Sequence, residues 1–120
     1  MRNFEELQVG KKAHLLTLAI YEVTRSFPRD EQFGLTGQIR RAACSVGSNI
    51  AEGAGRDSDA DFARFLQMAA GSVSEVEYQL LLARDLGYLD ALRHDELKAA
   101  AQEVRRMLYG FIEYLRRKSP

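Results

Sequence analysis

Cysteine, histidine and proline are scarce in this sequence, and each scarcity excludes a class of protein or structure. A single cysteine, Cys44, cannot form an intramolecular disulfide or a cysteine-rich metal site. The only histidines, His14 and His94, have no partner at the HxxxH or HExxH spacing of helical metal sites. We therefore expect no catalytic residue, no metal and no cofactor. With two prolines, Pro28 and Pro120, the chain keeps long segments free of helix breakers.

A net charge and a long apolar run are also missing. The 120 residues include 17 basic and 17 acidic side chains, so the chain differs from a strongly basic nucleic-acid-binding protein. No apolar run reaches the roughly 20 residues of a membrane span. The opening MRNFEELQVGKK is polar and mixed, unlike an apolar leader. We expect a cytoplasmic protein with one domain over residues 1–120.

What the sequence has is apolar residues at helical spacing. They recur every three or four positions over residues 3–26, 37–54, 59–86 and 95–117, which predicts four amphipathic helices. Short connections between long helices favour antiparallel neighbours, so we expect an all-α, antiparallel up-and-down four-helix bundle. The predicted core stripes are Val9, Ala13, Leu16, Ile20, Val23 and Phe27; Ile39, Ala42, Ala43, Val46, Ile50 and Ala54; Phe62, Leu66, Ala69, Val73, Val76, Leu80 and Ala83; and Leu97, Ala101, Val104, Leu108, Phe111 and Leu115.

Residues at the ends of these segments predict where each helix starts and stops. Polar residues that can accept a hydrogen bond from a first-turn N–H are the expected N-caps, and glycines that allow left-handed backbone are the expected stops. The N-caps are Asn3 paired with Glu6, then Thr36 and Ser58; the stops are Pro28, Gly53 with Gly55, and Gly87.

A polar stripe follows the second predicted helix, in the segment QIRRAACSVGSNIAEGAGR at 38–56. At about 100° per residue, its members fall within an arc of roughly 80°, opposite the core stripe; they are Gln38, Arg41, Ser45, Asn49, Glu52 and Arg56. A small-residue edge of Cys44, Gly47, Ser48 and Ala51 lies between the two stripes.

Three interpretations of the polar stripe stay open. It is solvated, with Glu52 and Arg56 as an ordinary i,i+4 ion pair. It contacts another subunit or the start of the third helix, because buried polar groups must find partners. Or Arg41, Asn49 and Arg56 bind a phosphate backbone, although Glu52 among them would repel phosphate.

Other charged residues are candidates for contacts between helices or with nucleic acid. In GSVSEVE, Glu75 points away from the core stripe and Glu77 borders it, so both are either solvated or paired with arginines of the second helix, in the same chain or a neighbour. Basic residues recur as adjacent pairs and one triplet, which are solvated helix faces or parts of a nucleic-acid surface. The nucleic-acid candidates are Lys11, Lys12, Arg40, Arg105, Arg106, Arg116, Arg117 and Lys118.

Three segments resemble, in order, the signature blocks of a bacterial protein family. They are FEELQVGKKAHLLTLAIYEVTRSFP, FGLTGQIRRAACSVGSNIAEGAGR and FLQMAAGSVSEVEYQLLLARDLGYL, and they cover about residues 3–90. The family consists of small proteins encoded within intervening sequences of large-subunit ribosomal RNA genes, and the accessory protein of diversity-generating retroelements is related to it. The middle block, with its SxxSNIAEGxGR pattern, is the most specific.

The resemblance implies a four-helix bundle that assembles as a ring-like homopentamer, with nucleic-acid binding as its proposed role and no enzymatic activity. The chain departs from the family pattern at Gly10, where tryptophan is usual, and at Gly47, where proline is usual.

We expect a non-enzymatic oligomer that binds structured RNA or DNA through basic surfaces gathered by the oligomer. The alternative is a protein–protein assembly or adaptor module. The partners expected are other copies of the chain, RNA or DNA, and a protein; no membrane partner is expected.

Overall fold

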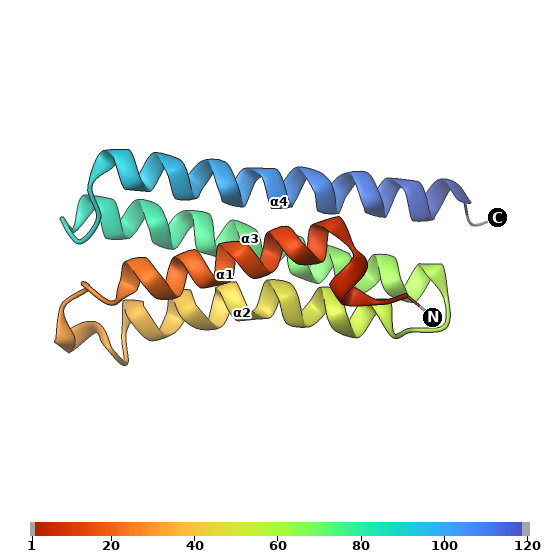
Figure 1. Cartoon of the computed structure of the whole chain (residues 1–120), viewed down its shortest axis with the longest axis horizontal. Coiled ribbons are helices and arrows are strands. Elements are labelled where there is room, and N and C mark those ends of the chain that lie inside the picture. The colour runs from red at the N-terminus through yellow and green to blue at the C-terminus, as the bar shows by residue number, and fades with distance from the viewer. Residues whose placement is uncertain (1, 119–120) are drawn as a thin grey trace.

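Residues 2–118, which the computed structural model describes, form four long α-helices (Figure 1). The helices are α1 at Gln8–Thr24, α2 at Leu35–Ala54, α3 at Asp59–Asp85 and α4 at Ala91–Lys118. Two short 3-10 turns, η1 at Phe4–Glu6 and η2 at Arg29–Glu31, precede α1 and α2. Because the described residues contain no strand, the predicted all-α fold is confirmed.

Each helix runs antiparallel to the one before it, which makes the up-and-down four-helix bundle that the sequence predicts (Figure 1). Helices α1 and α3 each pack on both α2 and α4, and not on each other. They therefore lie at opposite corners of the bundle and run in the same direction. The bundle is elongated, with dimensions of 49 × 23 × 20 Å.

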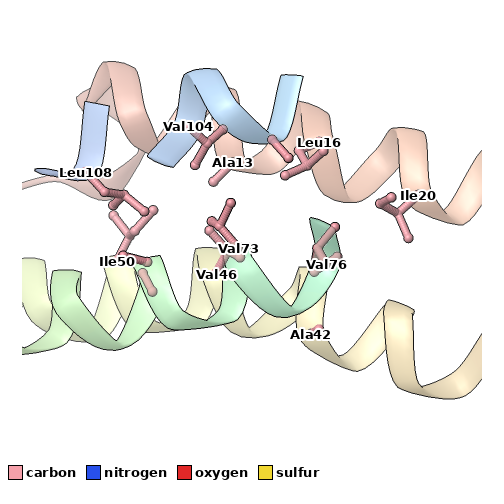
Figure 2. Close-up of a cluster of buried hydrophobic side chains, with 14 of the residues drawn as sticks. Ala13, Leu16, Ile20, Ala42, Val46, Ile50, Val73, Val76, Val104 and Leu108 are labelled. Carbon is pink, nitrogen blue, oxygen red and sulfur yellow. The ribbon is translucent and has the colours of Figure 1, made fainter. Parts of the chain in front are cut away.

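The apolar stripes of the four helices meet along the bundle axis. Figure 2 shows Ala13, Val46, Val73 and Val104, one from each helix, at the same level, and all four are at most 1% exposed. Every predicted core position is buried except two, Val23 and Phe111, which are partly buried and pack against the core.

On α4 the buried stripe passes through Ile112, which is 2% exposed, instead of Phe111. Ile112 continues the spacing from Leu108 to Leu115. The Phe111 ring lies beside the core, edge-on to Phe62 with 5.1 Å between the ring centres.

Two predicted helix starts are wrong because local hydrogen bonds set them elsewhere. The Asn3 side chain accepts from the N–H of Glu5 at 3.0 Å and caps the η1 turn, so α1 begins only at Gln8. The Asp90 carboxylate accepts from the N–H of Arg93 at 2.7 Å, so α4 begins four residues earlier than predicted. The Ser58 cap is confirmed, since its hydroxyl accepts from the N–H of Asp61 at 3.1 Å.

Helix α2 begins without the predicted Thr36 cap. Its first N–H, that of Leu35, donates to one carboxylate oxygen of Glu31 at 3.0 Å, and Thr36 is buried inside the helix. The second oxygen of Glu31 accepts from the Tyr88 hydroxyl at 2.9 Å, which joins the α1–α2 connection to the α3–α4 connection. The hydrogen bond from the Leu35 N–H, followed by that from Tyr88, lowers the pKa of Glu31.

Gly53 and Gly55 do not end α2 through left-handed backbone, as the sequence predicted. Among the described residues only Gly87, with φ of 80°, has a positive φ, and it follows the end of α3 as predicted. Gly53 instead allows α2 and α3 to approach. A Cβ at this position would lie 2.7 Å from the Cβ of Phe65 and 2.9 Å from the ring of Phe62.

Gly53→Ala should therefore lower the free energy of unfolding by about 2 kcal/mol, because overpacking displaces two buried aromatic side chains. The matched control is Gly110→Ala in α4, where an added Cβ meets nothing within 4 Å. That substitution should raise the free energy of unfolding by about 0.5–1 kcal/mol, since alanine favours a helix over glycine. Urea unfolding followed by circular dichroism measures both. Equal effects of the two substitutions would contradict a close α2–α3 contact at Gly53.

Candidate functional site

The centre of the polar stripe makes contacts within the chain. The hydroxyl of Ser72 in α3 donates to the hydroxyl of Ser45 at 2.9 Å. The Asn49 amide donates to the carbonyl of Ser45 at 2.9 Å and to its hydroxyl at 3.0 Å. All three residues are half-buried. The centre of the stripe thus joins α2 to the middle of α3, because the antiparallel register places Ser45 opposite Ser72.

The two ends of the stripe are exposed. Glu52 and Arg56 form an i,i+4 ion pair at 3.1 Å with side chains 63% and 43% exposed, a pair worth only a few tenths of a kcal/mol. The Arg56 guanidinium also lies 4.7 Å from the centre of the Phe65 ring on α3. At the other end, Gln38 and Arg41 are exposed.

A shallow groove of about 330 Å³ brings Glu75 beside the first half of the stripe. It is lined by Gln38, Arg41, Ala42, Ser45 and Glu75. The nearest hydrogen bond of the Glu75 carboxylate is within its own helix, from the Gln79 amide at 3.4 Å. The groove therefore places one cation and one carboxylate on opposite walls, on α2 and α3.

Glu77 pairs with α4 within the chain, and not with an arginine of α2. Arg105 donates to one carboxylate oxygen at 2.8 Å, with the Glu77 side chain 18% exposed and that of Arg105 33% exposed. The other carboxylate oxygen is buried and has no partner among the described residues. This pair links α3 to α4 at the border of the core.

Asp59 joins both ends of the described chain to the start of α3, a contact that the sequence did not indicate. Its two oxygens form ion pairs with Arg2 and, at 3.4 Å, with Lys118. Arg2 also donates to the carbonyl of Arg56 at 2.9 Å, and its guanidinium lies 4.6 Å from the centre of the Phe62 ring. These contacts gather η1, α3 and α4 at one end of the bundle (Figure 1).

Five of the eight nucleic-acid candidates are held by neighbouring side chains. Arg105 pairs with Glu77, Lys118 with Asp59, and Lys12 with Glu103 at 3.3 Å; Arg40 donates to Thr24 at 2.8 Å; and Arg116 donates to Gln67 at 3.5 Å. Lys11, Arg106 and Arg117 are exposed and have no ion pair within residues 2–118.

The second half of α4 carries most of this basic character. The segment RRMLYGFIEYLRRK, residues 105–118, contains five basic residues and one acidic residue. Arg106 and Arg117 are eleven residues apart, which is three helical turns, and thus share one face, with Tyr109 and the exposed, acidic Glu113 between them. Tyr109 and Tyr114 are 47% and 50% exposed. The sequence reasoning missed these tyrosines, although the spacing of three from Arg106 to Tyr109 could have indicated a shared face.

The described residues offer little to other kinds of site. No group of three or more His, Cys, Asp or Glu among them could hold a metal ion, and none of their helices is long and apolar enough to cross a membrane. Cys44 is exposed, with its thiol 3.5 Å from the hydroxyl of Tyr21. This hydrogen bond to the thiol raises the pKa of Tyr21.

A family model described as 23S rRNA-intervening sequence protein matches residues 5–110. The chain belongs to this family. The match confirms the resemblance seen in the three sequence blocks and extends it into α4, where the blocks did not reach. A comparison with curated proteins finds no match.

A solved structure supports the same conclusion. The chain is similar to a protein of unknown function from the S23 ribosomal protein family of Bacteroides thetaiotaomicron, whose crystal structure was determined at 1.70 Å. The TM-score is 0.81 and the sequence identity 26%, over 87% of this chain and 97% of that chain. The similarity over nearly the whole of both chains extends to all four helices.

The two departures from the family pattern lie against the same aromatic ring. A Cβ at Gly10 would lie 2.6 Å from the carbonyl oxygen of Phe4 and 3.1 Å from its ring, and a Cβ at Gly47 would lie 3.9 Å from that ring. Phe4 therefore fills the space above position 10. The η1 turn and a tryptophan at position 10 exclude one another sterically.

Arg105→Gln should lower the free energy of unfolding by about 1 kcal/mol, because it removes the one partner that a largely buried carboxylate has within residues 2–118. The matched control is Arg106→Gln, one residue later and exposed, which should change the free energy by less than about 0.5 kcal/mol. Chemical denaturation of both variants gives the comparison. Equal stability of the two variants would show that the Glu77–Arg105 pair does not stabilise the bundle.

Proposed function

We propose that the protein is a non-enzymatic homo-oligomer, a pentamer, that binds structured RNA or DNA through the second half of α4. The observation that carries this proposal is the separation of charge within a neutral chain. Five of its 17 basic residues lie in residues 105–118, which hold only one of its 17 acidic residues. A basic stripe along a helix is the electrostatic feature expected of a surface that contacts phosphates.

The contacts of individual side chains indicate which residues of this segment are available to a nucleic acid. Arg106 and Arg117 make no ion pair within the described residues, so they are available to phosphate oxygens. Tyr109, between them on the same face, offers an exposed ring on which an unpaired base can stack. By contrast, Arg105 and Lys118 already neutralise carboxylates on α3.

Assembly strengthens a surface that is weak in one chain. Two unpaired arginines supply few phosphate contacts, whereas several copies held together bind as one multivalent surface. Such binding should weaken steeply with salt, because each phosphate contact releases counterions.

The double substitution Arg106→Gln with Arg117→Gln tests the proposed surface. In an electrophoretic shift assay with a structured RNA, it should weaken binding at low salt and reduce the log–log salt slope by about two for each chain that contacts the RNA. The matched control, Arg29→Gln with Lys98→Gln, removes the same charge from exposed positions outside residues 105–118.

Equal binding by the two double variants would contradict a role for the second half of α4 in particular. Binding by the unchanged protein that stays constant across a salt titration would contradict phosphate recognition.

A protein–protein assembly or adaptor module is the alternative, and one observation favours it. Large apolar side chains are exposed on helix surfaces; among them are Leu15, Leu18, Met68, Tyr78 and Leu81. Apolar surface of this kind marks contacts with proteins more often than with nucleic acid. A protein that binds neither RNA nor DNA at low salt would have this second function.

A further inference from the structure

We infer that the outer face of α1 in one protomer packs against the outer face of α3 in a second copy of the chain. The inference rests on the self-assembly proposed above and names the surfaces that carry it. The α1 face consists of Lys11, Leu15, Leu18, Glu22 and Arg25; the α3 face consists of Gly71, Glu75, Tyr78, Leu81 and Asp85.

The α1 face presents two leucines to solvent. Leu15 and Leu18 are 59% and 52% exposed and lie one helical turn apart. They have polar residues on both sides along the helix, Lys11 before them and Glu22 after them. Because the core stripe of α1 lies on its opposite side, these leucines contribute nothing to the core of their own bundle.

The α3 face presents a matching apolar surface. Tyr78 and Leu81 are 62% and 39% exposed and also lie one turn apart. Gly71, two turns before Tyr78, is exposed, and a Cβ added there would meet nothing within 4 Å. A second helix can therefore approach the α3 backbone closely beside Tyr78.

The geometry of the bundle brings these faces to the same level. Helices α1 and α3 run in the same direction at opposite corners. Figure 2 shows Ala13 level with Val73 and Leu16 level with Val76. A rotation about an axis parallel to the bundle keeps each residue at its level, so Leu18 of one copy meets the region of Tyr78 in the next.

The charges on the two faces are complementary in this register. From its start to its end, the α1 face is positive at Lys11, negative at Glu22 and positive at Arg25. The α3 face is negative toward both ends, at Glu75 and at Asp85. At the observed levels, Arg25 is opposite Asp85, and Lys11 is about one turn from Glu75.

These charges are free to change partners. Glu22 and Arg25 are 3.7 Å apart, with side chains 68% and 77% exposed. The Arg84–Asp85 pair is also at the surface, with exposures of 38% and 61%. Exposed pairs of this kind are worth less than about 1 kcal/mol each, so pairing across an interface costs little.

The contact joins two different faces, so it is head-to-tail and builds a closed ring or an open filament. It leaves the outer face of α4 uncovered in every copy. The assembly thereby keeps Arg106 and Arg117 accessible, as the proposed function requires.

Two charge-introducing variants, Leu18→Glu on α1 and Tyr78→Glu on α3, test the interface by size-exclusion chromatography with light scattering. Each should reduce the oligomer of the unchanged protein to a monomer of 13.6 kDa. Both positions are exposed, so helicity by circular dichroism should not change. Phe33→Glu is the control, since Phe33 is 89% exposed in the connection before α2 and belongs to neither face; it should keep the mass of the unchanged protein.

Mixing the two variants gives the sharpest result. One intact α1 face and one intact α3 face remain in the mixture, so it should form a dimer and stop there. A monomeric mixture, either variant at the unchanged mass, or an unchanged protein that is itself monomeric would overturn the inference.

An RNA shift assay on the unchanged protein separates this result from the proposed function. RNA binding by a monomeric protein would overturn the interface and the proposed oligomer, and would leave nucleic-acid binding standing. An assembled protein that gives no shift at low salt would overturn nucleic-acid binding alone.

Discussion

The close contact between α2 and α3 is the constraint on which the rest of the structure depends. Gly53 has no room for a methyl group against Phe62 and Phe65, and the hydroxyls of Ser45 and Ser72 are 2.9 Å apart. The polar stripe of α2 therefore borders a packed interface, and its central residues find partners there because buried polar groups must be satisfied.

Spacing alone predicts the four helices and nearly all of the core, because the buried side of a helix depends on a period of 3.6 residues. Helix starts depend on hydrogen bonds that spacing does not reveal. Asp90 starts α4 and Glu31 meets the first N–H of α2 from outside the helix. Glycine is ambiguous in the same way, since sequence does not distinguish a stop, as at Gly87, from a close approach, as at Gly53.

The sequence predicts which residues make up the candidate site, but not which side chains they contact. The sequence places Ser45 and Asn49 on one side of a helix, but the register between two helices decides that Ser45 meets Ser72. Glu77 likewise borders the core as predicted, yet it faces α4 and pairs with Arg105. The family pattern adds the identity of the fold. It does not explain Gly10, whose role becomes clear only where Phe4 lies against it.

Zero net charge says little about the surface that a partner meets. Some charged side chains form ion pairs inside the fold, while others remain exposed to solvent. Arg105 and Arg106 are adjacent and chemically identical, but one neutralises a largely buried carboxylate and the other faces solvent. Successive residues of a helix point about 100° apart, so the first side chain faces α3 and the second faces away from it. In each adjacent basic pair of α1, α2 and α4, one member contacts a neighbouring side chain and the other is exposed. Arg106 and Arg117 are the exposed members of such pairs on α4, and they are the charges on which the proposed surface rests.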